Sequence, residues 1–261
     1  MTIEMITAFL HEMEEKHRIK ILYAVDSGSL SFGYASPESD TDVRFIYVNR
    51  PEYYFSLTPK ADTVNFISED HTLDVEGFDL KKALALMMKT NPIESDWLHS
   101  DLVYIEAPGF KEKMLEFERM YYNPKHAMYH FHSISVKHND RYFKEGITLK
   151  RFIYFMRGLL ACVWIERHGC HPPVNMDELI DAVVEDADMR ESAHRLLATK
   201  RLGRAHNNDP VDDCLVEYTK GLREYYEKFL PEFKANKPVG DEAALVKFLM
   251  EMIGFPLKGT L

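Results

Sequence analysis

Cysteine is scarce in this sequence, with only three residues among 261. Cys162, Cys170 and Cys214 form no even, closely spaced set, so a disulfide framework like that of small secreted proteins is excluded. Long apolar runs are also missing, and none approaches the roughly 18 apolar residues that a membrane span needs. Acidic residues interrupt positions 1–20, where a secretory leader would need an apolar segment. We therefore expect a soluble, cytoplasmic protein without a membrane partner.

Positive charge is in short supply as well. The chain carries 32 Lys and Arg against 42 Asp and Glu, for a formal net charge of −10. Binding along a nucleic-acid backbone needs clustered cations that replace counterions, so we expect no broad DNA-binding surface. What is present is an ordinary globular composition, 46% hydrophobic and 12% aromatic, in a chain long enough to bury a substantial core.

The apolar pattern changes near residue 108. Before it, short β-branched and aromatic runs predict strands at 20–25, 41–48, 61–68 and 72–76, the last two as a hairpin that Gly77 ends. Amphipathic spacing predicts helices at 2–17, 79–89 and 92–98. After it, helical spacing dominates, in segments 109–120, 123–143, 147–168, 176–185, 188–201, 211–229 and 241–253. We predict an α+β protein with a short mixed β-sheet and helices in a domain over 1–107, followed by an all-helical domain over 108–261.

Two aspartates and a Gly-Ser turn stand out in the stretch 27–44. Asp40 and Asp42 flank one residue at the start of a predicted strand, so their side chains point to one face and repel each other unless a cation lies between them. Mg²⁺ is often held by one or two carboxylates together with substrate phosphates. Gly28 allows close approach of the backbone to a phosphate, and the Ser29 hydroxyl and nearby N–H groups can bind phosphate oxygens.

A third carboxylate is expected on a neighbouring strand. Asp74 lies between two apolar residues and so faces away from the side that they bury. Glu76 shares its face and competes for the role. Asp79 is the third choice, because capping of the next helix already accounts for it.

The helix predicted at 147–168 carries a polar face that suits a nucleotide. Between residues 137 and 167, seven Lys or Arg stand against three acidic residues, an inversion of the overall charge. Lys150, Tyr154 and Arg157 fall at i, i+4 and i+7, on one helix face. Two cations with an aromatic ring between them can grip a triphosphate and stack on a base or ribose.

These motifs resemble the DNA polymerase β-like nucleotidyltransferase superfamily, in which Gly-Ser precedes an Asp-x-Asp pair and a third acid follows on a later strand. More narrowly, the sequence over about 20–170 is similar to the predicted nucleotidyltransferases described as RNA-repair-associated (RlaP-type) polymerases. In this family Arg and Ala often follow Gly-Ser, where this chain has Leu30 and Ser31. The similarity rests on the stretches 28–33, 36–44, 73–82, 91–92 and 150–157.

The resemblance implies a nucleotidyltransferase fold over residues 1–107, with the helical domain closing a nucleotide cleft. It implies that Gly28 and Ser29 hold a nucleoside triphosphate such as ATP, with two Mg²⁺ ions, or Mn²⁺ in their place, on Asp40, Asp42 and Asp74. A nucleoside monophosphate would pass to a hydroxyl of an RNA end, as in RNA repair, or of a protein side chain, with release of pyrophosphate. The alternatives are a nucleotide-binding regulatory module with weak catalysis and an antitoxin-like partner of a helical toxin.

Overall fold

The computed structural model describes residues 1–261 apart from 146–147, 204–205, 207, 236–237 and 256–261, and apart from the side chains of residues 138–145. Its one sheet has the strand order β3-β4-β2-β1-β5. The strands are β1 (Lys20–Asp26), β2 (Thr41–Val48), β3 (Thr63–Ile67), β4 (Leu73–Asp79) and β5 (Val103–Glu106). This sheet confirms the predicted mixed topology, since β2 and β4 run parallel while the other pairs are antiparallel.

Most of the sheet follows the predicted strands, and β3 with β4 forms the predicted hairpin. The expectation that Gly77 ends the fourth strand is wrong, because β4 continues through it to Asp79. Gly77 lies opposite Phe45 on β2, and a Cβ at Gly77 would lie 2.2 Å from the Phe45 ring. Here glycine makes room for an aromatic ring and does not break the strand.

Helices cover both faces of the sheet. Helix α1 (Ile3–His17) buries Ile6 and Leu10 against one face. The other face packs against three helices that follow the hairpin, and Phe110 and Phe117 belong to that second core. These helices are α3 (Leu80–Met87), α4 (Pro92–Leu98) and α5 (Phe110–Tyr121), while the short α2 (Pro51–Tyr54) follows β2.

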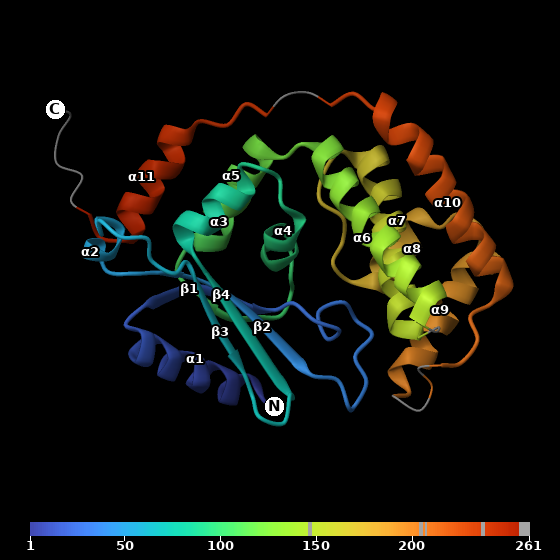
Figure 1. Ribbon diagram of the computed structural model, residues 1–261, viewed down its shortest axis with the longest axis horizontal. Helices are drawn as coiled ribbons and strands as arrows, with labels where there is room; N and C mark the ends of the chain where they lie inside the picture. Colours follow the sequence, from blue (N-terminus) through green and yellow to red (C-terminus); the bar gives the residue numbers. More distant parts are fainter. Residues whose placement is uncertain (146–147, 204–205, 207, 236–237, 256–261) are drawn as a thin grey trace.

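The remaining chain is helical, as predicted. Five helices form a bundle beside the sheet unit (Figure 1): α6 (Pro124–Glu145), α7 (Leu149–His168), α8 (Met176–Val183), α9 (Ala187–Arg201) and α10 (Asp213–Glu232). Helix α7 supplies much of the bundle core, including Phe152, Phe155 and Leu159.

The last helix leaves the bundle. Helix α11 (Glu242–Met252) crosses back to the sheet unit (Figure 1), where Phe248 packs on Phe110 and Phe117 with ring centroids 5.9 and 5.4 Å apart. The second core therefore draws side chains from both sides of residue 107, and the boundary at that position stays a prediction.

Candidate active site

The Gly-Ser turn is wound tightly just after β1. The Phe32 N–H donates to the Gly28 carbonyl at 3.0 Å, and the Tyr34 N–H donates to the Ser29 carbonyl at 3.0 Å. Ser29 is 7% exposed, and its hydroxyl has no hydrogen-bond partner among the described residues. The N–H groups of Ser29 and Leu30 likewise donate to no residue that the structure describes. The turn therefore presents three donors without acceptors, two from the backbone and one from a side chain.

Asp26, at the end of β1, shapes this turn from below. Its Oδ1 accepts hydrogen bonds from the N–H groups of Gly28 at 3.0 Å and Ser31 at 2.9 Å. Its Oδ2 accepts from the Tyr104 hydroxyl at 3.3 Å, and its carbonyl accepts from the Ser100 hydroxyl at 2.8 Å. Burial raises the pKa of Asp26, and these N–H donors oppose the shift. By occupying the N–H groups of Gly28 and Ser31, Asp26 fixes which donors the turn leaves available.

The turn lies directly on Asp42. A Cβ placed on Gly28 would lie 2.1 Å from Asp42 Oδ2, so a glycine is needed where the backbone crosses the carboxylate. The Ser27 N–H also donates to the Asp42 carbonyl at 2.9 Å. The predicted phosphate loop and the first strand acid therefore meet, at the end of the sheet where β1 ends and β2 begins.

Asp42 and Asp74 face each other across the parallel strands β2 and β4, where they are register partners. Between them lies Arg44, whose Nη2 is 3.3 Å from Asp42 Oδ1 and 3.1 Å from Asp74 Oδ2. Burial raises the pKa of Asp42, the charge of Arg44 opposes this, and Asp40, Asp74 and Asp26 raise it further. Asp40 itself lies just ahead of β2, close enough to act on Asp42 by charge.

The other two acids considered for the third position lie differently. Glu76 is the next residue along the same face of β4, two positions beyond Asp74, and is the register partner of Arg44. Asp79 pairs with Tyr47, five residues along the strand from Asp42, which is ~16 Å at the usual rise of a strand. It caps α3 through Lys81 and accepts from Asn49 and the Tyr54 hydroxyl. Geometry thus places Asp74 nearest to Asp42 and Asp79 in a capping role.

Two of the three residues on the predicted face of α7, Tyr154 and Arg157, contact the Gly-Ser turn. The Tyr154 ring lies edge-on to Phe32 and Tyr34, with centroids 6.3 and 6.4 Å apart. The Arg157 guanidinium lies 4.6 Å from the Phe32 ring centroid and pairs with Asp96 at 2.8 Å. Tyr154 and Arg157 therefore support the turn through its aromatic rings.

The charges on this face differ in their surroundings. Burial acts to raise the pKa of Asp96, but Arg157 and His171 outweigh it and hold that pKa below its ordinary value. Arg157 is only 4% exposed, whereas Lys150 is exposed at the start of α7. Of the two predicted cations, Lys150 faces solvent, whereas Arg157 is buried and paired with the carboxylate of Asp96.

Helices α8 and α9 also hold the turn, which the sequence did not reveal. The Met176 N–H donates to the Phe32 carbonyl at 3.0 Å, and Arg201 Nε donates to the Gly33 carbonyl at 2.8 Å. Arg201 also pairs with Asp177. No local pattern links residues 168 positions apart. Asp26 could have been identified from the sequence, since it is the acidic residue between an apolar strand and the Gly-Ser turn.

The donor set suits a hard divalent ion. Three carboxylates lie at one end of the sheet, and oxygen ligands are what Mg²⁺ prefers. The unpaired hydroxyl and free N–H groups of the turn beside them suit phosphate oxygens. Among the described residues, no three His, Cys, Asp or Glu side chains are already gathered closely enough to hold a metal ion. In this structure the Arg44 guanidinium, with its own positive charge, contacts the facing carboxylates of Asp42 and Asp74.

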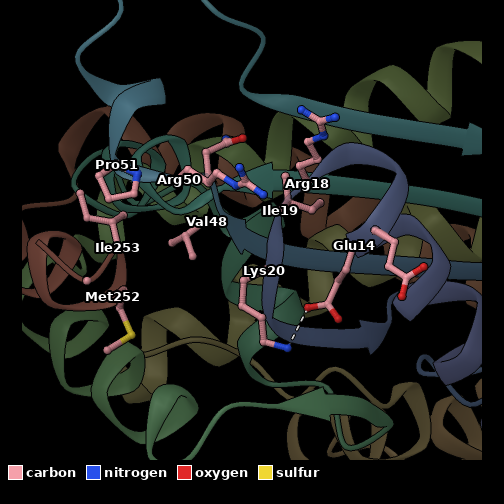
Figure 2. Close-up of a pocket in the computed structure, with 12 residues that line it drawn as sticks. Glu14, Arg18, Ile19, Lys20, Val48, Arg50, Pro51, Met252 and Ile253 are labelled. Atoms are coloured by element: carbon pink, nitrogen blue, oxygen red, sulfur yellow. Dashed lines mark ion pairs between the residues drawn. The ribbon is translucent and has the colours of Figure 1, made fainter.

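A broad cavity of about 610 Å³ lies at the opposite end of the sheet (Figure 2). Its wall includes Arg18, Val48, Arg50 and the end of α11, and it contains the Lys20–Glu14 ion pair, 2.9 Å long. None of its lining residues belongs to the Gly-Ser turn or to the acid pair.

A Gly-Ser turn that packs on a carboxylate, with a second carboxylate on the adjacent parallel strand, defines a nucleotidyltransferase-like protein. The family model described as "RlaP: RNA repair pathway DNA polymerase beta family" matches residues 3–244, and the chain belongs to this family. The match confirms the resemblance drawn from residues 20–170. It also extends that resemblance through the bundle to α11, over a stretch for which the sequence alone suggested no relative.

Two further comparisons concern individual proteins. The protein of Bacillus subtilis (strain 168) described as "Uncharacterized protein YcgL" is 33% identical over 229 residues, which cover 87% of this chain and 88% of that protein. The crystal structure of a nucleotidyltransferase-like protein from Exiguobacterium sibiricum 255-15 aligns with a TM-score of 0.34 and 9% identity over 85% of this chain and 75% of that one. A score this low does not establish a shared fold, and the assignment rests on the sequence comparisons. No helix in the described part of the chain is both long and apolar enough to cross a membrane.

Proposed function

We propose that this protein is a Mg²⁺-dependent nucleotidyltransferase, which moves a nucleoside monophosphate from a nucleoside triphosphate to a hydroxyl and releases pyrophosphate. One observation carries the proposal: the backbone of Gly28 packs on the carboxylate of Asp42, which lies opposite Asp74 in the sheet. A phosphate-binding turn and two acids thereby meet at one point, as transfer of a phosphoryl-linked group requires.

The turn would hold the triphosphate. Its three unpaired donors, the N–H groups of Ser29 and Leu30 and the hydroxyl of Ser29, are groups that bind phosphate oxygens. The exposed Lys150 would add a cation, and Tyr154 and Arg157 pack on Phe32 of the turn. Leu30 lacks the charge that Arg would bring at this position, so backbone donors bear more of the binding.

Asp40, Asp42 and Asp74 would hold the divalent ions, two Mg²⁺ or Mn²⁺. When bound, such ions lower the pKa of an attacking hydroxyl and neutralise charge on the leaving oxygens. In the transfer, the acceptor oxygen forms a bond to the α-phosphorus as the bond from that phosphorus to the bridging oxygen breaks. The hydroxyl proton passes to solvent water, and pyrophosphate leaves.

Labelling tests the proposal and identifies the acceptor together. The purified protein is incubated with each of the four α-³²P nucleoside triphosphates, Mg²⁺, and either total RNA or a protein extract from its native host. We expect label on one acceptor class, lost on addition of EDTA and in the Asp42→Asn variant. A label on RNA that survives protease supports an RNA end as acceptor, and a label removed by protease supports a protein side chain. Absence of label and of released pyrophosphate with every nucleotide and acceptor pool would refute transfer.

Two observations favour a second function, that of a nucleotide-binding regulatory module or an antitoxin-like partner. Leu30, 49% exposed, offers an apolar side chain beside the turn where the family often has Arg, and Arg44 already neutralises part of the acid pair. Titration calorimetry with a non-hydrolysable triphosphate, beside a pyrophosphate assay, separates the two. Binding without turnover supports the module, and a toxin that is recovered with the tagged protein from the host and carries the label supports the antitoxin-like role.

A further inference from the structure

Arg44 occupies an unusual place for a cation in a site built from acids. It follows Asp42 by two residues on β2, so both side chains lie on the same face of the sheet. Its side chain is only 16% exposed. Of the resolved ion pairs, it is the one that joins the two facing strand acids, and it does so through a single nitrogen, Nη2.

The two ends of the guanidinium have different partners. Nη1 donates to the carbonyls of Val43 at 3.0 Å and Asp74 at 3.1 Å, which fixes the head group to the backbone of both strands. Nη2 is then left to reach Asp42 Oδ1 and Asp74 Oδ2. Because Nη1 is anchored to carbonyls, the guanidinium can give up a carboxylate contact without leaving the sheet.

Arg44 also fixes the orientation of the Asp42 carboxylate. The Oδ1 atom of this carboxylate faces Nη2, and its Oδ2 atom lies against Gly28. The oxygen that Arg44 leaves free is therefore the one beside the predicted phosphate turn. Without the arginine, two partly buried carboxylates on adjacent strands would repel each other and would lack a fixed orientation.

We propose that Arg44 is a positioning residue that neutralises and orients the Asp42–Asp74 pair before a divalent ion arrives, and that the ion competes with Nη2 for the same two carboxylates. The first half rests on contacts within this chain, and the second half rests on the proposed function. Because the competition is reciprocal, the loss of Arg44 makes the fold more dependent on metal and makes metal binding tighter.

Thermal unfolding in EDTA tests the first half. In the absence of divalent ions, Arg44→Gln is expected to lower Tm by roughly 3–6 °C, since it leaves two unscreened carboxylates together. Adding Asp74→Asn to this variant removes the repulsion and should restore most of the loss. The Arg44→Lys variant keeps a charge but offers one amine in place of two nitrogens, so its Tm should fall between those of wild type and Arg44→Gln.

Binding of Mn²⁺, followed by electron paramagnetic resonance, tests the second half. We expect Arg44→Gln to bind Mn²⁺ at least fivefold more tightly than wild type and to gain more in Tm when Mn²⁺ is added. Asp74→Asn should weaken Mn²⁺ binding in either background. An activity assay alone would not separate these effects, because a merely structural arginine would also lower turnover.

The outcomes distinguish the two proposals. A Tm in EDTA equal to that of wild type, a loss that Asp74→Asn does not restore, or weaker Mn²⁺ binding in Arg44→Gln would each overturn the role given to Arg44. If Arg44→Gln does not fold, the comparison of Arg44→Lys with Arg44→Lys/Asp74→Asn decides the same question. If wild type and variants all fail to bind Mn²⁺, the proposed function fails, while the EDTA measurements still decide whether Arg44 holds the pair.

Discussion

The contact between Gly28 and Asp42 gives the sharpest prediction. Replacing Gly28 with alanine adds a Cβ that would lie 2.1 Å from Asp42 Oδ2, 2.7 Å from its Cβ and 2.8 Å from its Cγ. The backbone at Gly28 does not have a positive φ, so alanine introduces no backbone strain and the perturbation is steric. To restore an ordinary contact, the carboxylate must move by about 1 Å or more.

That displacement sets the expected size of the effect. Overpacking of this kind costs about 1–3 kcal/mol in the free energy of unfolding, and misplacing a group in an active site by 1 Å reduces turnover by roughly 100-fold. We therefore expect Gly28→Ala to be folded but nearly inactive. The measurements are urea unfolding at pH 7 and release of pyrophosphate under the labelling conditions.

Gly221 provides the matched control. It lies exposed within α10, and nothing lies within 4 Å of a Cβ built on it. Gly221→Ala should raise the free energy of unfolding by about 0.5–1 kcal/mol through helix propensity and leave turnover unchanged. If Gly28→Ala matched Gly221→Ala in both stability and turnover, the turn could not lie on the Asp42 carboxylate as described.

Further predictions concern the charges around the turn. Because burial and neighbouring acids raise the pKa of Asp42 in the fold, its ionisation weakens the native state as pH rises above about 4. Asp42→Asn should thus increase the free energy of unfolding at pH 7, with the gain shrinking at pH 3, as measured by urea unfolding at both values. Arg157→Ala leaves Asp96 as a partly buried, less compensated carboxylate and should cost about 3 kcal/mol, a loss that Arg157→Lys reduces in the same assay. Lys150→Ala changes an exposed residue, so its free energy of unfolding should stay within about 0.5 kcal/mol of wild type while calorimetry shows weaker triphosphate binding at low salt; unchanged binding would remove Lys150 from the site. Arg201→Ala frees the carbonyl at the end of the turn and should speed amide exchange across residues 28–34 and raise KM for the triphosphate more than it lowers kcat.

Local patterns in the sequence predicted most of the elements, and the reasons for the exceptions are physical. The strand at Val103–Glu106 has only four residues and borders β1 at the sheet edge, too short to show an alternation of its own. At Gly77, the rule that glycine interrupts a strand failed because the Phe45 ring on the neighbouring strand needs the space. Residue spacing cannot report such a contact between strands.

In the candidate site too, local spacing predicted some features, whereas contacts between distant residues could not be predicted. The side-by-side placement of Asp42 and Asp74 follows once two strands are assumed to be neighbours, and spacing within each strand indicates which face the acids share. The sequence showed Arg44 as part of a motif but did not predict its role. One nitrogen of Arg44 contacts both acids only because β2 and β4 pair in this register. The role of Arg201 could not be predicted from the sequence, because its contact with Gly33 joins distant parts of the chain.

The return of α11 to the sheet unit has a consequence for how the two halves of the molecule can move. The bundle is joined to the sheet unit by two connecting segments, one leading from α5 into α6 and one from α10 back to α11. Because the bundle also packs around Phe32 and Tyr34 of the turn, these two connections restrict movement of the bundle relative to the acid pair. During synthesis, moreover, the aromatic surface formed by Phe110 and Phe117 stays uncovered until Phe248 emerges from the ribosome. The sheet unit is completed by α11, after the bundle has been made.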